Sequence, residues 1–225
     1  MYNKIKKLWL FTLAIPKTIY FNFYYFSFKE AIKFPVLVSH RVYLMEMKGK
    51  VILRGPLKKG MIKIGFGEVG IFDQHRSRSI WQVSGTVMFI GNALIGHGSK
   101  ISVSKHGELE FGANFVITAE SQIWCKKKII FGDNVLISWE NLIMDTDAHI
   151  IKNNKGEIIN EESPIIIGDK VWMGCRCTIL KGTLIGSGTI IAAGSLIAGN
   201  YKGEERIILG GRPTRVLKEN VFWQS

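Results

Sequence analysis

The sequence predicts an all-β protein: a parallel β-helix with a basic, aromatic segment at its N-terminus and a protruding loop near residues 149–164. Three observations support this prediction. Large aliphatic side chains recur every six residues, small or β-branched residues recur four positions after them, and the excess positive charge lies almost entirely in the first 63 residues.

Composition excludes several classes of protein. The chain has 225 residues, of which 47% are hydrophobic and 21% are charged. An intrinsically disordered chain is therefore excluded, because such chains lack the apolar surface needed to offset their entropy. The 24 glycines have no three-residue period, so collagen is excluded too. The length fits one globular domain with an appendage.

Residues 1–63 form the first predicted unit, and they are strongly basic. They contain 13 Lys and Arg against two acidic residues, whereas the remainder has 17 against 16. Aromatic residues crowd the same segment, with nine of them between Trp9 and Phe28. Lysine interleaved with aromatic and aliphatic residues is typical of a segment in a membrane interface. We expect residues 1–38 either to contact a membrane or to cap one end of a soluble core.

A membrane-spanning helix over residues 8–28 is a weaker alternative. The stretch is long enough, but Pro16, Lys17 and Asn22 fall near its middle. No small-residue cleavage site follows the early apolar run, so we do not expect a cleaved signal peptide. Nucleic acid is not an expected partner, because no recognisable module is present and the basic residues precede the main domain.

The six-residue repeat defines the second predicted unit, residues 64–200. Each six-residue unit corresponds to a flat strand plus a turn, and three units make one triangular coil. Glycine follows three of the aliphatic residues directly, where we expect it to supply conformations that are costly for other residues. The pattern extends backwards raggedly to Ile64. The regular aliphatic series is Ile167, Met173, Ile179, Ile185, Ile191 and Ile197, and the small-residue series is Val171, Cys177, Thr183, Thr189 and Ser195.

Between Ile143 and Ile167 the spacing remains a multiple of six, although the residues in between do not show the repeat. Ile143 and Ile167 are 24 residues apart, which is four units of six, but residues 149–163 do not read as repeat. Asn153, Gly156 and Pro164 predict a loop that leaves the coil, and loops on rigid scaffolds often carry function. Residues 201–225 form the third predicted unit.

Four stretches carry a resemblance to a known family: DTDAH at 145–149, IGDKVWMG at 167–174, ILKGTLIGSGTIIAAGS at 179–195 and GGRPTRVLKE at 210–219. They resemble the hexapeptide-repeat acyltransferases, and within that family most of all the O-acetyltransferases of surface polysaccharides. The resemblance implies a left-handed β-helix, a homotrimer, acetyl-CoA as co-substrate and a carbohydrate acceptor. It also implies a cytoplasmic enzyme, which the basic N-terminus would hold at the inner face of the membrane.

The predicted catalytic group centres on His149. Acyl transfer to a hydroxyl needs a general base, and histidine has a suitable pKa. His149 matches the catalytic base of the family. Asp145 and Asp147 precede it at two-residue spacing, so in an extended segment all three would share a face and either carboxylate could orient the imidazole. Asp147 is also expected at a small-residue corner of the coil.

The resemblance also implies the cofactor-binding residues. Trp172 matches a tryptophan beside the acetyl-CoA site of the family, and basic side chains suit the phosphates of the cofactor. The family often has Thr-Lys directly after its final coil, whereas this chain has Ala198 and Gly199, so we expect one phosphate contact to be either lost or shifted to Lys202. The predicted cofactor residues are Trp172, Gly174, Cys175, Ala193, Arg215 and Lys218, with Arg212 as a helper.

Several alternatives remain open at the level of sequence. The same base could serve N-acetylation of an amino sugar or a small molecule, and a non-catalytic β-helix scaffold is a further alternative. Zinc chemistry of the γ-type carbonic anhydrases is not expected, because no two of the five histidines are five residues apart. We expect no metal site. The three cysteines fit no zinc or disulfide framework, which favours a reducing compartment.

Overall fold

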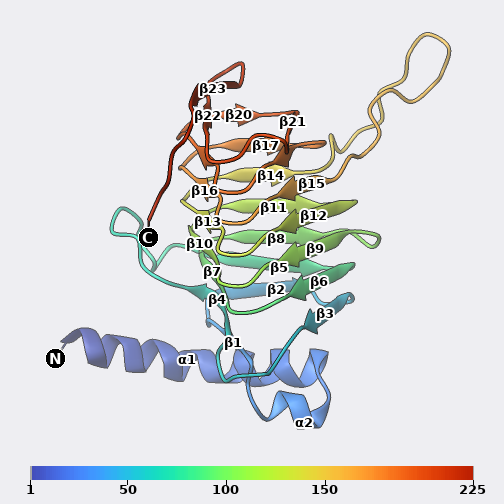
Figure 1. The fold of residues 1–225 in the computed structure, drawn as a ribbon. Helices are drawn as coiled ribbons and strands as arrows, with labels where there is room; N and C mark the ends of the chain where they lie inside the picture. The colour runs from blue at the N-terminus through green and yellow to red at the C-terminus, as the bar shows by residue number, and fades with distance from the viewer. Residues whose placement is uncertain (1, 225) are drawn as a thin grey trace.

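The computed structural model describes residues 2–224 and shows a left-handed parallel β-helix with an N-terminal helix across one end (Figure 1). The chain passes through three sheets in rotation, so each coil adds one strand to each sheet. Neighbouring strands of successive coils pair in parallel. The predicted fold class is confirmed, and the expected loop at 149–164 projects from the coil as the long yellow excursion in Figure 1.

The strands fall into three stacks. The first sheet contains β1 (Val36–Val38), β4 (Ile62–Phe66), β7 (Ala93–His97), β10 (Phe115–Ala119), β13 (Leu136–Ile137), β16 (Trp172–Met173), β19 (Ile190–Ile191), β22 (Ile208–Gly210) and β23 (Arg215–Lys218). The second contains β2 (Val42–Glu46), β5 (Ser79–Val83), β8 (Lys100–Val103), β11 (Gln122–Cys125), β14 (Leu142–Met144), β17 (Thr178–Leu180) and β20 (Leu196–Ile197). The third contains β3 (Lys50–Leu53), β6 (Thr86–Phe89), β9 (Glu108–Phe111), β12 (Lys128–Phe131), β15 (Ile165–Ile167), β18 (Leu184–Ile185) and β21 (Asn200–Tyr201).

The six-residue repeat becomes three columns of buried side chains, one per sheet. In the second sheet the strand register stacks Ile123, Ile143, Ile179 and Ile197 directly above one another, all buried. The third sheet begins its column with Leu53, which pairs with Phe89, and the adjacent rings of Phe89 and Phe111 stack with centroids 5.0 Å apart. The core is therefore a continuous interior column, as the spacing predicted.

The glycines after the aliphatic positions have a different role from the expected one. Gly174 is not among the residues with positive φ, and a Cβ built on it would lie 2.7 Å from the backbone nitrogen of Ala193 in the next coil. Gly168 and Gly186 are likewise crowded by the coil above. Close approach of successive coils therefore excludes a side chain at these positions. The left-handed backbone occurs later in the turn, as at Gly194 with φ of 72°.

The coil begins earlier than residue 64 and ends later than residue 200. β1, β2 and β3 form a complete first coil, because β1 pairs with β4, β2 with β5 and β3 with β6. The upper end extends through β22, and β23 then folds back on it as an antiparallel strand. Both expected boundaries are corrected. Irregular spacing hid the first coil. In the last coil the position six after Ile197 is Gly203 and not a large aliphatic residue, although Leu209 of β22 keeps the phase, eighteen residues after its partner Ile191.

The N-terminal segment forms α1 (Tyr2–Tyr25) and the short α2 (Phe28–Ala31). α1 lies across the first coil, with Phe21 fully buried against Trp81 at a centroid distance of 5.4 Å. Among the described residues, no helix is both long and apolar enough to cross a membrane. The segment therefore caps one end of the core, which was one of the two expected roles.

Polar side chains of α1 complete the hydrogen bonding of β1. The side-chain amide of Asn22 donates to the carbonyl of Val36 at 2.7 Å, and its oxygen accepts the Val36 amide at 3.2 Å. The hydroxyl of Thr18 accepts the Val38 amide, and the ammonium group of Lys17 donates to the carbonyls of His40 and Val42. A strand at the edge of a sheet has unpaired backbone groups. The polar residues that argue against a spanning helix thus take the place of a missing neighbouring strand.

Candidate functional site

His149 lies at the corner where the chain leaves β14 in the second sheet and enters the loop 149–164. Ala148 has a φ of 66°, which turns the chain, and the amide of His149 donates to the carbonyl of Asp147 at 2.7 Å. The His149 side chain is exposed. No described residue forms a hydrogen bond or an ion pair with its imidazole, so the ring faces solvent beside the loop.

Asp145 does not share a face with His149, which corrects the expectation. Its side chain is fully buried, and its carboxylate accepts the backbone amides of Lys126, Lys127 and Lys128 at 2.7, 2.8 and 2.6 Å. The positive φ at Ala148 breaks the extended geometry that two-residue spacing assumed. Asp145 therefore holds the corner of the coil below, and nothing in its contacts connects it to the imidazole.

Asp147 points out of the coil and is not at a buried corner position, which corrects a second expectation. Its carboxylate accepts the Lys181 ammonium group at 2.5 Å and the Asn160 side-chain amide at 3.0 Å. The hydrogen bond from Lys181 is the largest cause that lowers the pKa of Asp147, followed by that from Asn160. The carboxylate thus remains charged and joins the turn before His149 to the corner of the next coil.

Asn160 fastens the two arms of the loop, and sequence reasoning missed both it and Lys181. The Asn160 side chain donates to the His149 carbonyl at 2.8 Å and accepts the Ile151 amide at 2.7 Å. Lys181 also donates to the Asn160 carbonyl at 2.8 Å. We call Asp147, Asn160 and Lys181 the loop clamp. Its members are far apart in sequence, so no local spacing could have identified it.

A hollow of about 660 Å³ opens between the loop and the stacked corners below it. His149 and Asp147 line one side, and the corner residues His106 and Lys126 line the coil side. Lys126 pairs with Glu162 on the loop at 2.6 Å, so the loop is tied to the coil at two places. The volume lies within the range of small-molecule sites. The exposed imidazole therefore stands at the rim of a formed cavity.

The residues predicted to hold the cofactor gather on a different corner, between the first and second sheets. Trp172 is 37% exposed, and its indole nitrogen donates to the Ser138 hydroxyl at 3.3 Å. The centroid of the Trp223 ring lies 6.2 Å from that of Trp172 in a tilted arrangement, and no sequence pattern indicated this contact. Trp172 thus presents part of one ring to solvent at the side of the coil.

The neighbouring predicted residues follow Trp172 up this corner. Cys175 accepts the Gly194 amide through its carbonyl at 2.8 Å, which places Ala193 one coil above Gly174 and Cys175. Arg212 donates to the Gly194 carbonyl at 3.2 Å and lies one coil higher again. We call this line of residues the corner strip: Trp172, Gly174, Cys175, Ala193 and Arg212.

Basic side chains lie above the corner strip. Arg215 and Lys218 are exposed on β23, and Arg215 pairs with Gly210 of β22. Lys202 is exposed after β21, which belongs to the third sheet, so the structure places it away from the corner strip. The structure thus groups the predicted phosphate-binding residues except for Lys202.

The corner strip and His149 lie at opposite edges of the second sheet. Cys175 marks the first corner and Lys181 marks the second, where it contacts Asp147. The six residue-to-residue steps from Cys175 to Lys181 span at most roughly 20 Å at about 3.3 Å per step. One chain therefore carries both groups of predicted residues without bringing them together.

The cysteines and possible metal ligands add little chemistry to the site. Cys125 and Cys177 are buried, and burial is the main cause that raises the pKa of each thiol. The thiol of Cys177 contacts backbone carbonyls of its own coil and the next. Within residues 2–224, no group of three His, Cys, Asp or Glu side chains could hold a metal ion.

Comparison with known proteins agrees with the fold and the repeat. Residues 164–199 match the family described as bacterial transferase hexapeptide (six repeats). A putative lipopolysaccharide biosynthesis O-acetyl transferase, WbbJ of Escherichia coli K12, is 25% identical over 63% of this chain and 78% of its own length. The polysialic acid O-acetyltransferase of Neisseria meningitidis is 33% identical over 60% of this chain and 64% of its own length.

A solved structure shares the fold. The crystal structure of the polySia-specific acetyltransferase NeuO superposes with a TM-score of 0.52 at 20% identity, covering 84% of this chain and 79% of that one. Residues 164–199 thus carry the hexapeptide repeat of bacterial transferases, and the chain as a whole is similar to named O-acetyltransferases with this repeat.

Proposed function

We propose that the protein transfers an acetyl group from acetyl-CoA to a hydroxyl of a carbohydrate, in a capsular, lipopolysaccharide or exopolysaccharide precursor, with His149 as general base. The observation that carries the proposal is the exposed imidazole at the rim of the hollow, with its backbone fixed on both sides. The named activities of the E. coli and N. meningitidis relatives support a polysaccharide acceptor.

The reaction needs one proton acceptor and no covalent enzyme intermediate. A ring nitrogen of His149 takes the proton of the acceptor hydroxyl as its oxygen attacks the thioester carbon. Collapse of the tetrahedral intermediate breaks the carbon–sulfur bond, and the protonated imidazole returns the proton to the departing thiolate. The products are the O-acetylated sugar and CoA. Cys175 plays no covalent part in this scheme.

The loop clamp gives Asp147 a positioning role. Its carboxylate is bound to Lys181 and Asn160, and Asn160 holds the His149 carbonyl. These contacts fix the backbone on either side of the imidazole, which limits the orientations of the base. From inside the coil, the Asp145 carboxylate supports the chain before His149 by accepting the backbone amides of residues 126–128 in the coil below.

The corner strip suits a long, anionic thioester. Trp172 offers an apolar ring face, Ala193 leaves open space beside the backbone, and Arg212, Arg215 and Lys218 supply positive charge above. Phosphate groups pair well with such cations. The adenine-nucleotide end would then lie near β23, and the acetyl group near Trp172.

A homotrimer would bring together the two groups of predicted residues, His149 and the corner strip, that a single chain keeps apart. His149 and the corner strip occupy opposite edges of one sheet, so a second copy must contribute one of them to a complete site. In a closed three-fold ring each copy would give its His149 corner to one neighbour and its corner strip to the other. The exposed isoleucines of the loop, Ile150 and Ile159 at 68% and 61%, support burial against a neighbouring copy.

The direct test measures thiol release from acetyl-CoA in the presence of oligosaccharides and amino sugars. We expect acceptor-dependent release by the wild type and a loss of about 10²- to 10⁴-fold in His149→Ala. His75→Ala is the matched control, because His75 is an exposed histidine outside the hollow. Mass spectrometry of the product, before and after mild alkali, distinguishes an O-acetyl from an N-acetyl group.

Each outcome decides between functions. Normal transfer by His149→Ala would refute the general base, and an alkali-stable product would establish N-acetylation. Absence of both transfer and acetyl-CoA binding by calorimetry would identify a scaffold. A trimer mixed from His149→Ala and Trp172→Ala chains regains activity only if one site takes residues from two copies.

We also propose that the enzyme works on the cytoplasmic side of the membrane. Free cysteines and the use of acetyl-CoA support this placement. Labelling of Cys175 in intact and permeabilised cells tests it, because a membrane-impermeant maleimide should react only after permeabilisation.

A further inference from the structure

The outer face of α1 is a large apolar surface without a partner in the described structure. Trp9, Leu13, Pro16, Tyr20 and Phe23 follow spacings of four and three residues, so they lie on one side of the helix, opposite Phe21 and Asn22, which face the coil. All five are exposed. We use the name base for this row together with the other exposed large apolar side chains of α1, α2 and Ile32. The exposed large side chains of the base are Trp9 62%, Leu13 36%, Ile15 52%, Ile19 43%, Tyr20 55%, Phe23 43%, Tyr24 49%, Phe28 73% and Ile32 50%.

Such a surface needs an explanation because a helix that is apolar on both sides is normally buried on both sides. The coil covers only one side of α1. A contiguous apolar patch of this kind marks an interaction site. The polar residues of the helix, Lys17, Thr18 and Asn22, are already used against β1 and the chain after it, so they cannot explain the outer face.

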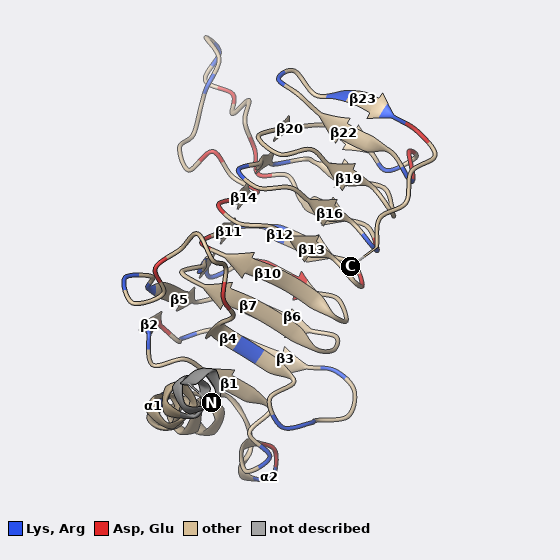
Figure 2. Ribbon diagram, turned by 90° about the vertical axis from the view of Figure 1, so that its left-hand side faces the viewer, with Lys and Arg blue, Asp and Glu red and all other residues tan. Residues whose placement is uncertain are grey.

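Positive charge lies beside the apolar surface at its α2 end. α1 has no acidic residue in its sequence, and its Lys17 is turned toward the coil, so the exposed lysines that matter here come after the helix. Lys29 and Lys33 are exposed around α2, and Glu30 is the one acidic residue among residues 1–45. Lys58 and Lys59 are exposed in the turn that contacts Phe34, since the Gly60 amide donates to the Phe34 carbonyl at 3.0 Å. Figure 2 shows these blue segments beside α2 at the same end of the molecule.

We propose that the base binds the surface of an anionic lipid bilayer, with α1 lying in the plane of the interface. Aromatic and aliphatic side chains would enter the boundary between headgroups and acyl chains, and the lysines would meet lipid phosphates. A second copy of the chain is a less suitable partner for the base, because two bases packed face to face would bring the exposed lysines of both copies close together. The proposal concerns attachment alone and does not depend on the transfer chemistry.

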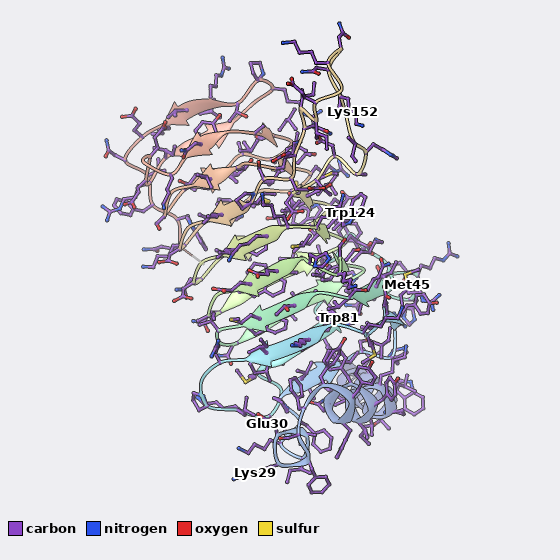
Figure 3. The ribbon with its side chains drawn as sticks, turned by 90° about the vertical axis from the view of Figure 1, so that its right-hand side faces the viewer. Lys29, Glu30, Met45, Trp81, Trp124 and Lys152 are labelled. Carbon is purple, nitrogen blue, oxygen red and sulfur yellow. The ribbon has the colours of Figure 1, made fainter. Side chains whose placement is uncertain are left out.

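The position of α1 fixes how the molecule would stand. The helix runs across the end of the coil, and the coil extends away from it on the other side (Figure 1). Lys29 and Glu30 lie at one end of the molecule and Lys152, on the loop 149–164, lies toward the other (Figure 3). Docking by the base therefore stands the coil upright on the bilayer, with His149 and its hollow several coils away from the lipid.

The test is cosedimentation of the full chain with vesicles of phosphatidylcholine alone and of phosphatidylcholine with one quarter phosphatidylglycerol. We expect binding to the anionic vesicles that weakens with salt, and at least tenfold weaker binding for the double variant Trp9→Ser, Phe23→Ser. Trp9 points away from the coil, and the Phe23 ring packs on Phe28 and Phe34. Circular dichroism should therefore stay unchanged, and the melting temperature should fall only slightly. Lys29→Glu, Lys33→Glu should weaken binding to the anionic vesicles only.

Ile71→Ser is the matched control, because Ile71 is 67% exposed on a different segment. It should bind vesicles as the wild type does. A brominated lipid should quench tryptophan fluorescence in the wild type and much less in Trp9→Phe. No binding to anionic vesicles, or equal binding by Trp9→Ser, Phe23→Ser, would overturn the proposal. A fall in molar mass by light scattering for that variant, without vesicles, would show instead that the base joins copies of the chain.

Discussion

Replacing Asp145 tests whether this carboxylate is structural or catalytic. It is fully buried and accepts three backbone amides from the turn between β11 and β12. Two of these amides, from Lys127 and Lys128, share one carboxylate oxygen, and the amide of Lys126 uses the other. Asp145→Ala therefore removes three bonds to a charged acceptor, whereas Asp145→Asn can keep two of them by turning its amide nitrogen toward Lys126.

The magnitude follows from these bonds. A hydrogen bond to a charged group contributes about 1.5–3 kcal/mol, and water can reach part of this turn in the variant. We expect Asp145→Ala to lower the free energy of unfolding by about 3–5 kcal/mol, and Asp145→Asn by about 1–3 kcal/mol because one bond is replaced by two opposed donors. Asp133→Asn is the control: its carboxylate accepts the Ala113 amide at 2.7 Å from an exposed position.

Urea unfolding followed by circular dichroism, at one protein concentration, measures the difference. The acetyl-transfer rate per folded chain should change little in Asp145→Asn, and its pH profile should match the wild type. If Asp145→Asn instead unfolds at the wild-type urea concentration while its pH–rate profile shifts, Asp145 acts on the imidazole and the structural interpretation is refuted.

Three further predictions follow from contacts described above. Because the pKa of Asp147 is lowered in the folded protein, the loop clamp is fully formed above the ordinary carboxyl pKa and is lost as the pH falls through the lowered value. Amide hydrogen exchange in residues 149–164 should therefore become faster in acid. In Lys181→Ala it should be faster already at neutral pH. Asn22→Leu leaves the amide and carbonyl of Val36 unpaired, so urea unfolding should show a loss of about 2–4 kcal/mol, and an unchanged midpoint would contradict the edge-pairing role. Gly174→Ala should cost about 1–3 kcal/mol from overlap with the next coil. Gly194→Ala, where a Cβ would meet nothing within 4 Å, should cost about 1–2 kcal/mol of backbone strain, and a larger loss of stability in Gly194→Ala than in Gly174→Ala would contradict the role of crowding at Gly174.

The fold was predictable because the regular geometry of a β-helix requires a regular spacing of large aliphatic residues in the sequence. Each coil places one large side chain per sheet in the interior, so the spacing of six survives wherever the coil is regular, as from Ile167 to Ile197. The first coil was not predictable in this way. The insert 67–78 separates β4 from β5, and the resulting shift of phase hides the relation between Val42 and Ser79, which the structure pairs.

The site was predictable only in part. His149 and Trp172 could be identified from short motifs, but the roles of the carboxylates depend on one backbone angle at Ala148 and on contacts across the coils. Asn160 and Lys181 are 13 and 34 residues from Asp147 in the sequence. Asn160 belongs to no motif, and nothing in the stretch 179–195 indicated that Lys181 would contact Asp147. The reason for glycine at 174 was also hidden, since the crowding comes from a residue in the next coil.

The number of coils sets the distance between α1 and His149. His149 follows β14, which is the fifth strand of the second sheet counted from α1. Four steps of about 4.8 Å, plus about 10 Å for the thickness of α1, place the imidazole roughly 30 Å from the outer face of that helix. Removing one whole coil below β14 would shorten this height by one step and leave both capped ends unchanged. If α1 rests on lipid, the length of the coil sets how far from the bilayer a glycan chain must reach before one of its sugars can be acetylated.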